Sequence, residues 1–150
     1  MLPAYRDGQW SYTVERWGAN AVKEICFPDE SCDFAAMSEE GSVFLGAYDG
    51  ETCGGLVILQ PGFFKYMYLY DLKVSGAYRG QGVGQRLIER AKEIAAQQNY
   101  RGLYTQGQDN NPGACLFYLK SGFRIGGLDT DLYRHTAQEG KADIIFYIDC

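Results

Sequence analysis

The sequence is poor in the residues that bind metals. It has one histidine, His135, and its five cysteines are irregularly spaced without a Cys-x-x-Cys pair. Structural zinc sites take about four such ligands, so no metal site is expected. An odd number of cysteines also fits reduced thiols better than a disulfide framework, which favours a cytoplasmic location.

Positive charge is also scarce, with 14 Lys and Arg against 19 Asp and Glu and a formal net charge of -5. General nucleic-acid binding needs clustered cations to neutralise phosphates, so no nucleic-acid partner is expected. No stretch is long and apolar enough to span a membrane, and no signal peptide is visible. The acidic balance is compatible with a small cationic partner, although it is also ordinary for a soluble protein.

The 150 residues fit one α/β domain, residues 1–150, without repeats or linkers. Apolar periodicity and turn signals predict strands at 10–14, 43–48, 54–59, 64–74, 102–105, 123–128 and 143–148, and helices at 19–27, 85–98 and 112–120. Asp49-Gly50 predicts that the strands on either side of it form an antiparallel hairpin.

A glycine-rich segment, YRGQGVG at 78–84, lies between the long predicted strand and the predicted helix at 85–98. Glycines let the backbone approach a ligand closely and adopt positive φ. The N–H groups of the helix's first turn and its positive dipole end then point at an anion. The segment therefore predicts a cradle for a phosphate-bearing ligand.

Two nucleotide-binding cradles fit poorly. A Walker P-loop needs Gly-Lys-Ser/Thr, whereas Gln85-Arg86 follows Gly84. The dinucleotide fingerprint needs a third glycine where Leu87 stands and an acidic residue at the end of the next strand, where none occurs before Asp109.

A third cradle fits. The pattern R-x-x-G-x-G from Arg79 to Gly84 resembles the pyrophosphate loop of the GNAT superfamily of N-acetyltransferases, which bind acetyl-coenzyme A. Downstream, N-x-x-A-x-x-F-Y-x-x-x-G-F from Asn111 to Phe123 resembles the second helix of the same family. The resemblance covers about residues 42–148. It implies a central, mostly antiparallel mixed sheet flanked by helices and splayed after Val74, and allows for a homodimer.

The resemblance also implies which residues hold acetyl-coenzyme A. The pyrophosphate would be held by Arg79, Gly80, Gln81, Gly82, Val83, Gly84 and Gln85. Leu72 and Val74 would pair their backbones with the pantetheine arm, and the Asn111 side chain would contact it. Asn111 also precedes a proline at a helix start, so an N-cap alone is the alternative for this residue.

For catalysis, the resemblance implies direct attack of the amine on the thioester, with Tyr118 donating a proton to the departing thiolate. A buried aromatic beside Phe117 is the alternative for Tyr118. Cys115 lacks a histidine partner and is expected to be a buried small hydrophobe rather than a nucleophile.

Within the superfamily, segments 68–74, 108–118 and 125–133 are similar to streptothricin acetyltransferases, which acetylate a cationic antibiotic. Those enzymes tend to carry Glu where Tyr70 and Gln106 stand, two positions expected to contact the acceptor. Asp71 remains as a candidate base, although strand alternation places it opposite Tyr70. A water relay and the acidic residues Asp29, Glu30 and Asp33 are further candidates.

The expected reaction is transfer of the acetyl group of acetyl-coenzyme A to a primary amine of a small cationic acceptor, with streptothricin-type antibiotics favoured. Polyamines, amino acids and a protein N-terminus are alternatives. The missing glutamates also allow a non-catalytic sensor that binds acyl-coenzyme A. The tyrosines at 66, 68 and 70 would line an acceptor pocket or pack against a helix.

Overall fold

The computed structural model describes residues 1–15 and 33–150, so the predicted helix at 19–27 lies outside the described residues. The elements in chain order are β1 Leu2–Arg6, β2 Gln9–Thr13, α1 Phe34–Glu39, β3 Val43–Asp49, β4 Thr52–Gln60, β5 Tyr66–Val74, the 3-10 turn η1 Gly76–Tyr78, α2 Val83–Gln97, β6 Gly102–Gln108, α3 Pro112–Lys120, β7 Arg124–Asp129 and β8 Asp143–Asp149.

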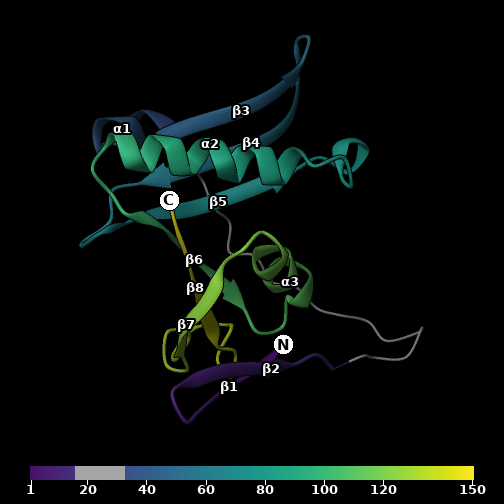
Figure 1. The fold of residues 1–150 in the computed structure, drawn as a ribbon, viewed down its shortest axis with the longest axis vertical. Helices are drawn as coiled ribbons and strands as arrows, with labels where there is room; N and C mark the ends of the chain where they lie inside the picture. The colour runs from purple at the N-terminus through teal and green to yellow at the C-terminus, as the bar shows by residue number, and fades with distance from the viewer. Residues whose placement is uncertain (16–32) are drawn as a thin grey trace. The chain divides into compact units, whose positions relative to one another are not determined.

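The strands form a two-stranded sheet, β1-β2, and a six-stranded sheet in the order β3-β4-β5-β6-β8-β7 (Figure 1). β3, β4 and β5 pair antiparallel, whereas β5 and β6 pair parallel. The predicted mixed α/β class is therefore confirmed.

The chain divides into two compact units. The cradle unit comprises Ser31–Thr105 and Tyr147–Cys150, and the hairpin unit comprises Met1–Glu30 and Gln106–Phe146. The boundaries fall within strands β6 and β8.

In the cradle unit, α2 packs on one face of β3, β4 and β5. The buried helix residues are Gly84, Leu87, Ile88, Ala91 and Ala95, which recur at helical spacing as the sequence predicts. A Cβ added at Gly55 would lie 3.0 Å from Leu87 Cδ1, which places Gly55 on the α2 face. By alternation, Val57 and Leu59 share that face, and both are fully buried.

The predicted hairpin of β3 and β4 is confirmed, with Gly50 in the left-handed region at φ 59°. The predicted start of the next strand at Phe64 is wrong, because β5 begins at Tyr66. Phe63 and Phe64 lie in the preceding turn and are 97% and 89% exposed. A hydrogen bond fixes the end of this turn, where Arg101 N–H donates to the Lys65 carbonyl at 2.6 Å.

A β-bulge interrupts the pairing of β4 with β5. Ile58 pairs with Asp71 and Leu59 pairs with Leu69, which leaves Tyr70 as the extra residue. Leu69 pairs with Leu59 and lies on the α2 face, so the next residue, Tyr70, faces away from α2. Asp71 pairs with Ile58, which alternates with Leu59 and also faces away from α2. The prediction that Tyr70 and Asp71 lie on opposite faces is therefore wrong.

The parallel ladder between β5 and β6 is short. Its pairs are Tyr66–Gly102, Met67–Leu103 and Tyr68–Tyr104. Beyond the last pair, the Thr105 hydroxyl donates to the Leu69 carbonyl at 2.9 Å, so a side chain replaces the backbone donor there. The pairing of the two strands thus ends before Leu69 rather than after Val74, where the sequence places the splay.

The hairpin unit contains β1, β2, α3 and β7. Asp7 and Gly8, at φ 52° and 79°, form the β1–β2 turn, as a type I′ hairpin requires. α3 starts at Pro112 as predicted and is followed by Gly122 at φ 93°. The buried side chains of this unit include Cys115, Tyr118, Phe123, Ile125, Ile144 and Phe146.

Candidate functional site

The glycine-rich segment forms a left-handed turn that leads into α2. Gly80 and Gly82 have φ of 74° and 79°, and Gly82 is the residue that caps the helix. A Cβ added at either glycine meets nothing within 4 Å. Backbone conformation, rather than crowding, therefore calls for glycine at these positions, and the exposed surface of the turn has room for a ligand.

The N-terminus of α2 is suited to an anion. The first helical bond of this end runs from Arg86 N–H to Gly82 C=O at 3.1 Å. By helix geometry, the N–H groups of Val83 and Gly84 precede that bond and point out of the helix end. The first turn holds no acidic residue, so the positive end of the dipole is not offset there.

Arg79 lies in extended backbone conformation just before this turn and is exposed. Its Nε donates to the Val74 carbonyl at 2.9 Å, which joins two residues predicted to hold the cofactor. Because a guanidinium carries five N–H donors, this bond leaves others to reach a phosphate. Gln81 Nε2 donates to the Ala77 carbonyl at 2.9 Å and holds the turn onto η1.

Tyr78 anchors the same turn to the β3–β4 hairpin. Its hydroxyl donates to Asp49 Oδ2 at 3.2 Å, and burial, together with Asp49, raises the pKa of the hydroxyl. The ring lies against Gly54, where an added Cβ would stand 2.8 Å from Tyr78 Cγ. Sequence reasoning misses this anchor; the Gly54-Gly55 pair in a strand is the signal for such a close approach.

Leu72 pairs with Val57 and Val74 pairs with Gly55. The side chains of both residues predicted to contact pantetheine therefore lie on the α2 face of the sheet. Tyr70 and Asp71 lie on the other face of the same strand. Lys73 Nζ lies 2.8 Å from Asp71 Oδ2, and the Asp71 side chain is 22% exposed. The carboxylate predicted as a base therefore already has a cationic neighbour.

The other predicted site residues belong to the hairpin unit. Asn111 Oδ1 accepts from Ala114 N–H at 3.4 Å, which confirms the N-cap and leaves the cap independent of the amide nitrogen. Gln106 lies on β6 and is half-buried.

Tyr118 is 8% exposed, and its ring contacts Phe117, Phe123 and Phe146 at centroid distances of 5.7, 5.4 and 5.5 Å. This packing is that of a buried core aromatic residue. The role of Tyr118 stays a prediction.

Other candidates from the sequence have ordinary surroundings. Cys115 is fully buried with Sγ 3.5 Å from the Gln108 carbonyl, as expected of a small core residue. Asp33 caps α1 by accepting from Ala36 N–H at 3.1 Å, while Asp29 and Glu30 lie outside the described residues. Within residues 1–15 and 33–150, no group of three or more potential metal ligands occurs.

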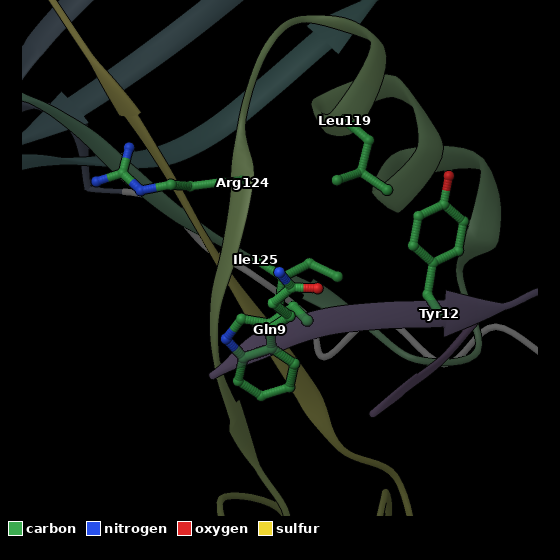
Figure 2. Close-up of a pocket in the computed structure, with 6 residues that line it drawn as sticks. Gln9, Tyr12, Leu119, Arg124 and Ile125 are labelled. Atoms are coloured by element: carbon green, nitrogen blue, oxygen red, sulfur yellow. The ribbon is translucent and has the colours of Figure 1, made fainter. Parts of the chain in front are cut away.

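The hairpin unit carries an open groove of about 430 Å³, none of whose lining residues the sequence singles out. Figure 2 shows Gln9 and Tyr12 from β2 facing Leu119 of α3 and Ile125 of β7, with Arg124 nearby; Trp10 completes the lining. No helix among the described residues is long and apolar enough to cross a membrane.

Comparisons with known proteins agree with the cradle. The model of the Acetyltransferase (GNAT) family matches residues 2–123. The chain is 33% identical to streptothricin acetyltransferase A of Bacillus subtilis, over 98% of this chain and 84% of the relative. It is 31% identical to a streptothricin acetyltransferase of Escherichia coli, over 73% of this chain and 63% of that enzyme.

Solved structures give the same result. A Bacillus anthracis protein assigned as a streptothricin acetyltransferase, in complex with acetyl coenzyme A, superposes with a TM-score of 0.70 at 32% identity. The match covers 76% of this chain and 68% of that one. A nourseothricin acetyltransferase superposes with a TM-score of 0.68 at 28% identity, over 75% of this chain and 67% of that one. The predicted resemblance is thus confirmed, and the chain belongs to the GNAT family of acetyltransferases.

Proposed function

We propose that this protein transfers the acetyl group of acetyl-coenzyme A to a primary amine of a small cationic acceptor, with streptothricin-type antibiotics as the favoured class. The chain is an acetyl-coenzyme A-dependent acetyltransferase of the GNAT kind. The observation that carries the acceptor class is the 33% identity to a streptothricin acetyltransferase over 98% of the chain.

The donor half of the reaction uses the cradle. The α2 N-terminus and the Arg79 guanidinium supply N–H donors for the pyrophosphate, and the left-handed turn at Gly80 and Gly82 lets the phosphates approach the backbone. Backbone groups of Leu72 and Val74 would hold the pantetheine arm, and the Asn111 amide nitrogen would add a contact. These assignments follow the family pattern residue by residue.

Transfer then needs positioning and two proton movements. The lone pair of the neutral amine attacks the thioester carbonyl carbon, a C–N bond forms and the C–S bond breaks. The departing sulfur takes a proton from the Tyr118 hydroxyl, which regains one from solvent. The attacking nitrogen gives up a proton to Asp71 or to water.

Asp71 is a better candidate base than strand alternation suggests. The bulge turns it to the same face as Tyr70, a position where the resemblance to streptothricin acetyltransferases implies a glutamate. Its partner Lys73 is 71% exposed, so the ion pair is accessible to an incoming cation. Tyr70 and Gln106 would contact the acceptor.

Thiol release from acetyl-coenzyme A, measured against a panel of amines, tests the proposal. Streptothricin should give the highest kcat/KM, and the product should carry one added acetyl group by mass spectrometry. Release with polyamines or amino acids but not with streptothricin would overturn the antibiotic assignment. Binding of acetyl-coenzyme A without release for any amine would favour the sensor, which the absence of glutamate at Tyr70 and Gln106 motivates.

A further inference from the structure

The first turn of α2 carries one basic side chain, that of Arg86, and this residue is exposed. Its backbone N–H donates to the Gly82 carbonyl at 3.1 Å, so Arg86 lies one helical turn after the residue that caps the helix. Residues four apart share a face of a helix, and each side chain tilts toward the N-terminus. The guanidinium of Arg86 therefore extends toward the glycine-rich turn of the cradle.

Arg86 differs from the other basic residues of α2 in having no acidic partner. Arg90 pairs with Glu93, and Lys92 Nζ lies 3.3 Å from Glu89 Oε2. Glu89 stands three residues from Arg86, a spacing at which helical ion pairs form, but it is already paired with Lys92. Within the part of the chain that the structure describes, no carboxylate pairs with Arg86.

The position of Arg86 is unfavourable for a cation unless an anion binds beside it. The N-terminus of a helix is the positive end of its dipole, so a cation there lowers the stability of the helix and an anion raises it. By helical spacing, Arg86 also lies on the side of α2 opposite its buried residues, so the side chain does not pack in the core. Neither packing nor an ion pair explains this arginine, whereas a bound anion would.

Acetyl-coenzyme A has such an anion outside its pyrophosphate. The pyrophosphate joins the pantetheine arm to adenosine, and a third phosphate stands on the 3′ position of the ribose. The proposed contacts of Leu72 and Val74 place the pantetheine arm along β5, on which α2 packs. The adenosine half then extends from the other end of the pyrophosphate, toward the solvent side of α2 where Arg86 lies.

The other basic residues of the cradle unit are paired or distant, apart from the arginine already assigned to the pyrophosphate. Lys73 pairs with Asp71 at 2.8 Å. Lys65 and Arg101 are joined by a backbone hydrogen bond at the start of β5. The cradle follows the end of this nine-residue strand, roughly 30 Å away.

We propose that Arg86 binds the ribose 3′-phosphate of acetyl-coenzyme A and makes the protein select the 3′-phosphorylated form of its cofactor. The inference rests on the proposed use of the cradle for the pyrophosphate and assigns a further specificity-determining residue to the same cofactor. A guanidinium suits this task, because it stays charged at neutral pH and can donate two N–H groups to one phosphate. The bound phosphate also offsets the unfavourable position of the cation at the helix end.

The first test needs only the unmodified protein and no acceptor. Acetyl-coenzyme A and 3′-dephospho-acetyl-coenzyme A, which lacks only the ribose phosphate, are titrated into it in parallel, and both Kd values are measured by calorimetry. Acetyl-coenzyme A should bind about tenfold more tightly, and this preference should shrink as the salt concentration rises, because an exposed ion pair is screened. Equal Kd values for the two ligands would overturn the proposal.

Variants then test the residue. Arg86→Gln should weaken the binding of acetyl-coenzyme A about tenfold and leave that of the 3′-dephospho form within about twofold, which abolishes the preference. Its melting temperature should stay the same or rise, because a cation is removed from the positive end of the helix dipole. Arg90→Gln is the matched control, since Arg90 lies one turn further along the same face and is paired with Glu93; it should keep the preference. Equal weakening of both ligands in Arg86→Gln, or loss of the preference in both variants, would contradict the assignment.

The inference and the proposed function fail in different ways. If the preference depends on Arg86 but no amine supports thiol release, the 3′-phosphate assignment stands and the transfer to a cationic acceptor falls. If amines are acetylated but the two forms of the cofactor bind with equal Kd values, the assignment falls and the transferase remains. If neither form binds, the cradle itself is wrong and the inference falls with it.

Discussion

At the scale of single residues, Asn111 has two separable ends. Its Oδ1 caps α3 by accepting from Ala114 N–H, whereas its amide nitrogen is the group proposed to contact the pantetheine arm. Asn111→Ser keeps an oxygen that can cap and loses the nitrogen; Asn111→Ala loses both. We expect Ser to keep the melting temperature and to raise the KM for acetyl-coenzyme A, and Ala also to lower the free energy of unfolding by about 0.5–2 kcal/mol.

Thermal unfolding and steady-state kinetics on both variants measure the two effects. An unchanged KM in Asn111→Ser would reduce the residue to a helix cap.

Tyr118 allows a similarly clean change. Tyr118→Phe keeps the ring that packs against Phe123 and Phe146 and removes only the hydroxyl. If the hydroxyl protonates the leaving thiolate, kcat should fall roughly 10²-fold or more, the size typical of general acid catalysis. The binding of acetyl-coenzyme A, measured by calorimetry, should stay within about twofold of the unmodified protein. A kcat that stays within experimental error would leave Tyr118 as a core aromatic.

At the scale of elements, the α2 N-terminus offers a test of the cradle. Gly82 has φ of 79°, a conformation that Asn and Asp tolerate better than other residues, and a Cβ there meets nothing within 4 Å. Gly82→Asn and Gly82→Asp therefore differ mainly in charge. Asp should raise the Kd for acetyl-coenzyme A at least about tenfold above that of Asn, because it places a negative charge beside the pyrophosphate. Equal Kd values for the two variants would mean that the phosphates lie elsewhere.

The elements that the sequence predicts well are those with local signals. α2 has its apolar periodicity, α3 has Asn111-Pro112 at its start, and the β3–β4 hairpin has Asp49-Gly50. No strand is predicted at β1, although Asp7-Gly8 marks its turn. The short α1 has little periodicity to detect, since it spans only Phe34–Glu39.

The bulge at Tyr70 could not be predicted, because it depends on how β4 and β5 align rather than on either strand alone. The same distinction runs through the candidate site. The donor cradle is a contiguous motif that the sequence predicts, whereas the anchor between Tyr78 and Gly54 joins residues distant in sequence and is not predicted.

At the scale of the whole molecule, stability should depend on pH through Tyr133. Its hydroxyl donates to Asp143 Oδ1 at 2.6 Å, and burial, followed by the bond to Asp143, raises its pKa from 10.0 to about 12. The folded state therefore favours the protonated phenol. Its contribution is fully present below pH 10, the unfolded value, and is lost as the pH rises through about 12.

Tyr133→Phe isolates this contribution from the other tyrosines, which also titrate at alkaline pH. The difference in free energy of unfolding between the two proteins, from urea denaturation, should be constant up to about pH 10 and shrink toward pH 12. A difference that is flat over this whole range would show that Tyr133 ionises alike in both states.

The bulge in β5 has a consequence for substitutions in this strand. In a regular strand, a functional side chain placed one residue earlier or later in the sequence lies on the opposite face of the sheet. At the bulge, the neighbouring residues Tyr70 and Asp71 lie on the same face of the sheet. Either position can therefore place a functional group on that face. A carboxylate at either position lies on the same face of the sheet, and the other position can hold a different side chain, such as an aromatic ring, without a change of fold.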